Sequence, residues 1–214
     1  MTAELKKFIA SYVTLSSTEM DSIAGRFNRK VVKKNDYLLR EGQVCKDIIF
    51  VQEGCLRLYY VSDDIEVSVW FSFKHSSAIE ISSFLSGKPT SYFLQAIEDS
   101  EILFLPKTEL NKLYRSQPKV QEMMRLFLED VILNLIDRFT SLQRDAAGKR
   151  YKDLLNKPAY LQKVPQKYLA SFIGVTPTSL SRIRRKTRSL FVVPGQLFST
   201  RLFLFCIIKK YQKK

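Results

Sequence analysis

The beginning of the chain has the spacing of apolar side chains that predicts helices. Leu5, Phe8, Ile9 and Tyr12 recur at intervals that place them on one face of a helix. The segment Ser16–Glu19 has the pattern of a capping box, in which a hydroxyl and a carboxylate satisfy the first N–H groups of a helix. We therefore predict two short helices before the main body of the chain.

Between about residue 31 and residue 105, short runs of β-branched and aromatic residues alternate with turn residues. Many short strands with regular turn breaks are typical of an antiparallel sandwich or a jelly roll. We predict that this part of the chain forms a double-stranded β-helix, or jelly roll. The predicted strands are residues 31–32, 37–39, 48–51, 56–61, 67–73, 92–97 and 102–105.

A long helix is predicted from about Val120 to Gln143, after a shorter helix that ends before Pro118. Its apolar residues cover more than one face, so more than one face must be buried. One face would pack on the β domain and another on a second copy of the chain. The alternative is the central core helix of a monomer. The residues predicted at the dimer interface are Met124, Phe127, Leu128, Val131, Leu135 and Leu142.

The net charge of +14 is distributed unevenly along the chain. Residues 1–145 carry 19 Lys and Arg against 20 Asp and Glu, whereas residues 146–214 carry 16 cations and a single acid, Asp153. A neutral body with a strongly basic end indicates a polyanionic partner. We divide the chain where the balance changes sign. The predicted parts are a β domain at 1–117, a dimerisation helix and hinge at 118–145, and a basic domain at 146–214.

Residues 164–186 have the pattern of two short helices joined by a tight turn. Pro165 is placed to begin the first helix, and Gly174 to end it in a left-handed backbone conformation. Thr176 would cap a second helix whose first residue is Pro177. This is the arrangement of a helix-turn-helix motif. The fold class we predict is α+β, with a jelly-roll domain, a long helix and a winged-helix-like C-terminal domain.

The second of these helices carries hydroxyls first and cations after them, which suits a helix in the major groove of DNA. Arg and Lys would reach guanine bases or phosphates, and phosphate contacts supply affinity without sequence information. The alternative is a solvated cationic face on an ordinary helical hairpin. The predicted DNA-binding residues are Gln166, Lys167, Thr176, Thr178, Ser179, Ser181, Arg182, Arg184, Arg185 and Lys186.

The histidine and cysteine content argues against an enzyme. Because His75 is the single histidine of the sequence, a two-histidine metal site or a Ser-His-Asp triad with a supporting histidine network is not favoured. Cys45, Cys55 and Cys206 are widely spaced, which fits a reducing cytosol and offers no metal-ligand spacing. We predict no catalytic residue, no metal site and no certain cofactor. The alternative is a cupin-like small-molecule-binding protein.

The segment Leu190–Ile208 is mostly apolar and long enough to suggest a membrane span. Pro194 and Gly195 interrupt it, and Arg201 lies in its middle, where a charge is costly in lipid. We expect this segment to pack on the protein, as a wing-like hairpin or a C-terminal helix. With no signal-peptide pattern at the N-terminus, the prediction is a cytoplasmic protein without a membrane partner. The alternative is that the basic end binds an anionic membrane.

Together, the β domain, the long helix and the motif resemble a Crp/Fnr-type transcription regulator, particularly those of Bacteroidetes-like bacteria. The resemblance covers residues 5–188, and Arg182 matches the arginine with which the family contacts a base or a phosphate. It implies a sensor domain, a homodimer, and binding of double-stranded promoter DNA at a palindromic site, with RNA polymerase as a further candidate partner. Pro177 and Thr178 depart from the family's best-known members, so the operator is not carried over. The matching segments are Leu38–Gly42, Phe50–Gly54, Phe84–Pro89 and Ser179–Arg184.

In the family's cyclic-nucleotide cassette, a Gly-Glu pair and an Arg-Ser pair surround the ribose phosphate. By resemblance, Glu80 matches the glutamate and Ser91 the serine, but Ile79 replaces the glycine and Thr90 replaces the arginine. Without that arginine, a buried cyclic phosphate lacks a fixed cation. We therefore expect an effector pocket around Glu80, Thr90 and Ser91 for an unknown small molecule, and we expect that cyclic AMP is not the effector.

Overall fold

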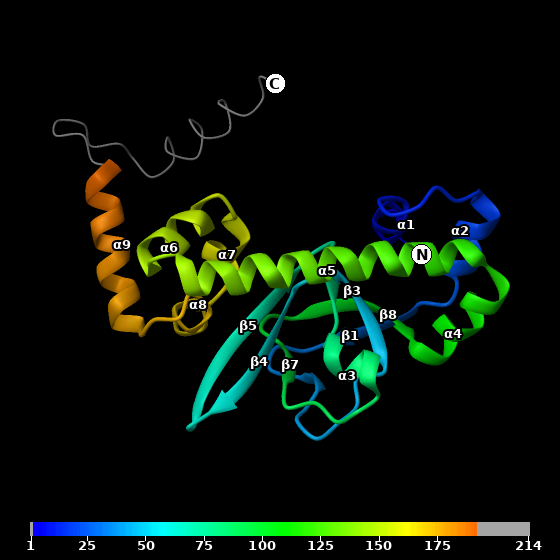
Figure 1. Ribbon diagram of the computed structural model, residues 1–214, viewed down its shortest axis with the longest axis horizontal. Coiled ribbons are helices and arrows are strands. Elements are labelled where there is room, and N and C mark those ends of the chain that lie inside the picture. Colours follow the sequence, from blue (N-terminus) through cyan, green and yellow to red (C-terminus); the bar gives the residue numbers. More distant parts are fainter. Residues whose placement is uncertain (1, 192–214) are drawn as a thin grey trace.

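The computed structural model describes residues 2–191 of the chain, and the side chains of residues 2–187. The fold is α+β with antiparallel sheets, as predicted (Figure 1). The helices are α1 (Ala3–Ala10), α2 (Ser17–Ala24), α3 (Ile81–Ser86), α4 (Lys107–Ser116), α5 (Pro118–Arg144), α6 (Ala147–Leu155), α7 (Pro158–Lys163), α8 (Gln166–Phe172) and α9 (Pro177–Phe191).

The strands form two four-stranded sheets, one in the order β1-β8-β3-β6 and the other in the order β2-β7-β4-β5. All of their pairings are antiparallel. The strands are β1 (Asn28–Val32), β2 (Tyr37–Leu39), β3 (Asp47–Glu53), β4 (Cys55–Ser62), β5 (Ile65–Phe73), β6 (Ser77–Ala78), β7 (Phe93–Ala96) and β8 (Ser100–Pro106). Each predicted strand has a counterpart here, and the two-residue β6 is an addition.

Two helices were absent from the sequence-based prediction, α3 and α7. Each has only six residues, and three of the six in α3 are serines, which have modest helix propensity. An isolated helix of this length is unstable in water. Contacts with the rest of the chain therefore stabilise these helices, and the local apolar pattern is too short to predict them.

The N-terminal helices and the first part of α5 cover the sheet that contains β3. Leu5 and Ile9 of α1 are buried there, as their spacing predicts, and they join one hydrophobic cluster with Phe50 and Val120. The predicted capping box at the start of α2 is present, because Ser16 Oγ accepts from Glu19 N and the Glu19 carboxylate accepts from Ser16 N. The hydrophobic cluster, which includes Val120 of α5, attaches α5 to the β domain.

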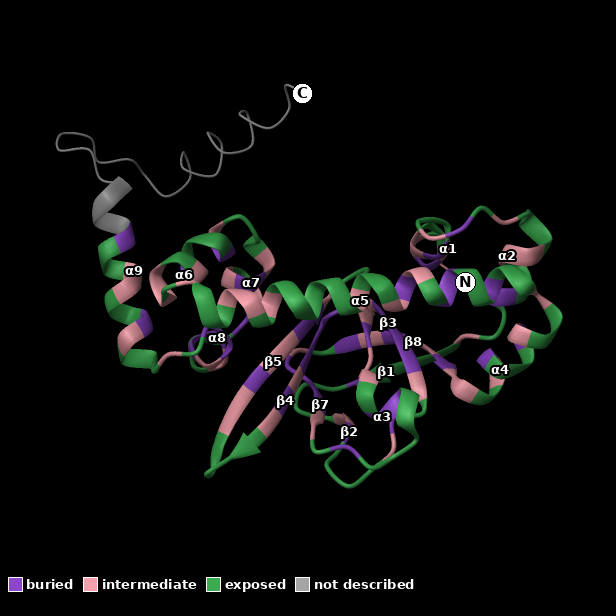
Figure 2. Cartoon of the chain, viewed as in Figure 1, coloured by how far each residue is buried: buried purple, intermediate pink, exposed green. Residues whose placement is uncertain are grey.

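Helix α5 changes character along its length (Figure 2). Met124 and Phe127 are buried in the core of their own chain, where the Phe127 ring lies 5.9 Å from that of Tyr12. Their assignment to a dimer interface was therefore wrong, because their surfaces are already covered. Beyond Val131 the helix has passed the sheet, and large apolar side chains are exposed. They are Ile132, Leu133, Leu135, Ile136, Phe139 and Leu142.

Helices α6 to α9 form a small helical unit, the head, at the C-terminal end of α5 (Figure 1). Leu169, Ala170, Ile173 and Leu180 are buried at its centre. The same hydrophobic cluster extends to Phe71 of β5, so the head rests on the β2-β7-β4-β5 sheet.

Candidate nucleic-acid interface and effector site

The turn between α8 and α9 is built by residues that the sequence singles out. Gly174 has φ of 71°, a left-handed conformation that ends α8 and that other residues adopt reluctantly. Thr176 Oγ1 accepts a hydrogen bond of 3.2 Å from Ser179 N, which caps α9 at its first turn. Pro177 is the first residue of α9, as predicted, whereas Pro165 precedes α8, which begins at Gln166.

Helix α9 has an inner face and an outer face. Leu180 and Thr187 point inward and are buried. The outer face consists of residues spaced three and four apart, all of them exposed: Thr178, Ser181, Arg182 and Arg185. Two hydroxyls and two guanidinium groups thus occupy one continuous surface, and α9 lies at the outer end of the head, away from the sheets (Figure 1).

Gln166, at the start of α8, connects the two helices. Its amide Nε2 donates to Ser181 Oγ at 2.6 Å, and its Oε1 accepts from Arg184 Nη1 at 3.5 Å. Three of the predicted DNA-binding residues are therefore brought together, and Arg184 is held toward α8. Lys167 of α8 and Lys186 of α9 are also exposed.

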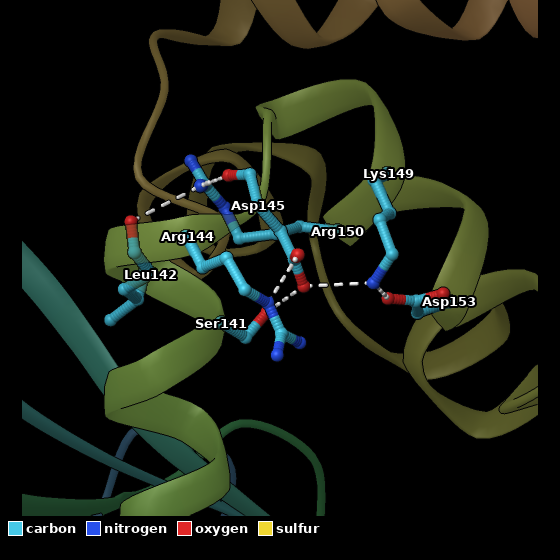
Figure 3. A network of polar contacts seen from close by, with 7 residues as sticks. All are labelled: Ser141, Leu142, Arg144, Asp145, Lys149, Arg150 and Asp153. Carbon is cyan, nitrogen blue, oxygen red and sulfur yellow. Dashed lines mark hydrogen bonds and ion pairs between the residues drawn. The ribbon is translucent and has the colours of Figure 1, made fainter.

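The junction between α5 and α6, around Asp145, is held by a network of polar contacts (Figure 3). The Asp145 carboxylate accepts from Lys149 Nζ at 2.8 Å and from Arg144 Nε at 3.1 Å. These two cations lower the pKa of Asp145 to about 2. Arg150 reaches back to the carbonyls of Leu142 and Asp145 and also donates to Ile173 O, so α5, α6 and α8 are joined through one guanidinium group.

In the β domain, Glu80 acts as the cap of α3. Its carboxylate accepts from the backbone N–H groups of Ser82 at 3.1 Å and Ser83 at 2.9 Å, and also from the Ser82 hydroxyl. The residue is 3% exposed. The side chain that resembles a ribose-binding glutamate is therefore occupied by the N-terminus of α3, where it already supplies the negative charge that a helix N-terminus favours.

Thr90 and Ser91, which align with the Arg-Ser pair of the cyclic-nucleotide cassette, supply no positive charge near Glu80. Thr90 is buried, its hydroxyl accepts from Tyr92 N at 3.0 Å, and its own N–H donates to Gln43 O. Ser91 and Lys88 are exposed. The phosphate of a cyclic nucleotide would find no fixed cation at Thr90, and the Glu80 carboxylate is already bonded to the start of α3, so the residues present do not fit a cyclic nucleotide.

A pocket of about 400 Å³ lies beside this region and is lined in part by Leu38, Gln43, Cys45, Asp47 and Leu94. None of the three predicted effector residues lines it. Two pocket residues contact this region through hydrogen bonds of their backbone, since Gln43 O accepts from Thr90 N and Cys45 N donates to Ser83 Oγ. Burial raises the pKa of the Cys45 thiol, which disfavours the thiolate form. The sequence carried no local sign of this pocket.

The structure contains no cluster of three histidine, cysteine or acidic side chains that would hold a metal ion, within the residues it describes. None of the described helices is long and apolar enough to cross a membrane. The segment Leu190–Ile208, for which a packed hairpin or helix was predicted, lies almost wholly outside the described residues.

Comparison with protein families places the β domain. A family model described as "Cyclic nucleotide-binding domain" matches residues 29–117. Residues 29–117 are therefore similar in sequence to cyclic nucleotide-binding domains. The match includes α3 with its cap Glu80, and both sheets from β1 onward up to the end of α4. A search of curated proteins found no match to the sequence.

The described part of the chain resembles several solved structures in its fold. FixK2 from Bradyrhizobium japonicum superposes with a TM-score of 0.67 at 15% identity, covering 81% of this chain and 89% of that one. A putative Crp/Fnr-family regulator from Eubacterium rectale gives 0.64 at 16% identity, with 89% and 94% covered. The c-di-GMP-responsive regulator CLP from Xanthomonas campestris gives 0.63 at 13% identity, with 85% and 96% covered. At these identities the likeness shows a shared fold: a β domain followed by a long helix and a small helical head.

Proposed function

We propose that this protein is a dimeric transcription regulator that binds a specific sequence of duplex DNA through α9. The observation that carries the proposal is the outer face of α9, where Thr178, Ser181, Arg182 and Arg185 are exposed side by side. Guanidinium groups bind guanine edges or phosphates, and short hydroxyls fit against bases, so this set suits major-groove reading. The Crp/Fnr arrangement of the fold supports the same function.

The individual DNA contacts follow from the positions on the head. Arg182 and Arg185 would contact bases or phosphates, and Lys167 and Lys186 would contact the DNA backbone at the edges of the surface. Gln166, Ser181 and Arg184 form a bonded group that sets the position of α8 against α9. Thr176 and Ser179 hold the first turn of α9.

The second half of α5 supports a homodimer. The six exposed apolar side chains named above on α5 are more than half of the ten large apolar side chains exposed in the described chain. Contiguous exposed apolar surface of this kind marks an interaction site. A second copy of α5 would cover this face, and the two heads would then be related by a two-fold axis, as a palindromic DNA site requires.

The β domain would sense a small molecule other than a cyclic nucleotide. Glu80 is occupied as the cap of α3, and Thr90 supplies no cation for a phosphate. The pocket beside Cys45 and Gln43 is the place proposed for an effector. Isothermal titration with cyclic AMP and cyclic GMP should show no binding. Micromolar affinity for either would overturn this part of the proposal.

The test of DNA binding is a gel shift with duplex DNA from upstream of the protein's own gene, over a series of salt concentrations. A specific regulator should retain preference for one segment over scrambled duplex as salt rises, because base contacts depend less on counterion release. Affinity that falls steeply with salt and shows no sequence preference would favour non-specific binding by the basic end. Binding to anionic vesicles in place of DNA would favour the membrane alternative.

A further inference from the structure

The head is fastened to the free edge of a β-sheet. Strand β5 ends the order β2-β7-β4-β5, so its outer backbone groups have no neighbouring strand in the sheet. Ser171 of α8 supplies the missing partner. Its hydroxyl accepts from Ser68 N at 2.8 Å and donates to Glu66 O at 3.0 Å, which satisfies two groups of the edge with one side chain.

Beside this bridge, a buried arginine joins the sheet to the head. Arg57 of β4 is 0% exposed, and its guanidinium lies between two aromatic rings, 4.1 Å from the centroid of Tyr59 and 3.7 Å from that of Tyr168. Tyr168 belongs to α8, one turn before Ser171. Arg57 Nε donates to Ser68 Oγ at 2.9 Å, and Nη1 pairs with Glu66 at 2.7 Å. The arginine and the serine bridge therefore share Glu66 and Ser68.

The Tyr59 side of this arrangement is fixed by the sensor domain. Its ring stacks on Phe93 of β7, with centroids 5.1 Å apart, and its hydroxyl is hydrogen-bonded to that of Tyr37 at 3.0 Å. The guanidinium of Arg40 in turn lies 3.7 Å from the Tyr37 ring centroid. Arg40 borders the loop that contacts Thr90, because Gly42 N donates to Thr90 O. A continuous row of rings and guanidinium groups thus runs from the proposed effector side to α8.

One polar atom in the closed arrangement is unsatisfied. Arg57 Nη2 is buried and has no hydrogen-bond partner. A buried guanidinium with an unpaired N–H group is unfavourable, and the group would gain water if α8 moved away from β5. Hydration of this N–H group would therefore offset part of the contact energy lost when α8 leaves β5.

We propose that Arg57, Tyr168 and Ser171 form an interdomain clasp that fixes the orientation of α8 and α9 against the β4–β5 hairpin. Closing the clasp sets the direction of α9 relative to α5, and opening it frees the head to turn. The row of side chains from Arg40 to Tyr59 places the clasp in contact with the side of the sensor domain that holds the pocket. Tyr168 and Ser171 are positioning residues, because neither lies on the outer face of α9.

Hydrogen exchange of the Ser68 amide in the full-length protein tests the clasp. This amide on the sheet edge is protected by Ser171, so it reports whether α8 is seated. Tyr168→Ala keeps the Ser171 side chain in the sequence but removes the ring above Arg57, so α8 should leave its position on β5 more often. We expect Ser68 to exchange at least about ten times faster in this variant. Tyr168→Phe keeps the ring and should leave the exchange as in the wild type.

The matched control is Lys167→Ala, which changes the preceding, exposed residue of the same helix and should leave Ser68 protected. The Val51 amide, bonded to Ser76 O inside the β domain, should stay protected in every variant and reports that the domain is folded. If the Val51 amide also exchanges faster in Tyr168→Ala, that variant has lost the fold of the β domain, and Ser171→Ala is used in its place. In Ser171→Ala the quantity measured is the exchange rate of the α8 amides, which should rise while the Val51 amide stays protected. Three results would overturn the proposal. The Ser68 amide could exchange at the wild-type rate in a folded Tyr168→Ala protein, or it could lose as much protection in Tyr168→Phe as in Tyr168→Ala. The α8 amides could also exchange at the wild-type rate in Ser171→Ala.

Discussion

The exposed half of α5 gives the most quantitative prediction. Phe139 is 61% exposed, and it lies among the other exposed apolar side chains of that helix. Complete burial of a large apolar side chain is worth about 1.5–3 kcal/mol, so covering the remaining surface of Phe139 would contribute about 1–2 kcal/mol per subunit. A symmetric dimer contains this residue twice. Phe139→Ala should therefore weaken the dimer by about 2–4 kcal/mol, which raises its dissociation constant about 30- to 1,000-fold.

Sedimentation equilibrium over a range of protein concentrations measures this change directly. Alanine preserves the helix, and Phe139 has little contact within its own chain, so the thermal stability of the subunit should change little. Leu85→Ala is the matched control, because Leu85 is 56% exposed but lies on α3. It should leave the dissociation constant unchanged. A wild-type protein that stays monomeric at high concentration, or a Phe139→Ala dimer as tight as the wild type, would show that this face of α5 does not form a dimer interface.

Three further predictions concern single side chains. Arg182→Ala should weaken binding to the specific DNA by about 1–3 kcal/mol if the guanidinium reads a base, measured by fluorescence anisotropy; an unchanged affinity would remove Arg182 from the contact surface. Glu80→Ala should lower the free energy of unfolding by about 1–2 kcal/mol through the lost cap of α3, and the melting temperature by about 2–8 °C. Glu41→Ala, at an exposed position, should leave both unchanged. Equal melting curves for Glu80→Ala and the wild type would contradict the capping role. Because the folded-state pKa of Asp145 is lowered to about 2, its stabilising contribution is present above about pH 4 and is lost as the pH falls toward 2. Proteolysis between α5 and α6 should therefore increase over that range, and Asp145→Asn should increase it at neutral pH; a pH-independent cleavage rate in both proteins would contradict this.

Local signals in the sequence predicted several helix ends and one buried helix face. The conformation of Gly174 and the caps at Ser16 and Thr176 depend on residues within a few positions of one another, so the sequence alone contains the information. The helical spacing of Leu5 and Ile9 likewise identified a buried face. These features need no knowledge of distant parts of the chain.

Features that depend on distant contacts were harder to predict. The spacing along α5 reveals apolar faces but not where the sheet ends, so Met124 and Phe127 were assigned to a partner although their own chain covers them. Glu80 matches a ligand-binding pattern, yet it caps a helix that has no apolar signature of its own. Arg57 has no local sign of its role, because Tyr168 approaches it only in the folded chain.

The central claim, that a dimer of this protein reads duplex DNA, is tested most directly by selection from a library of random duplexes with the purified protein. The account predicts enrichment of one inverted repeat whose half-sites are centred about one helical turn apart, about 10 base pairs or a multiple of it. The same selection with Arg182→Ala should lose preference at particular positions of each half-site. A pool that stays random while still binding the protein, or a motif without two-fold symmetry, would contradict the account.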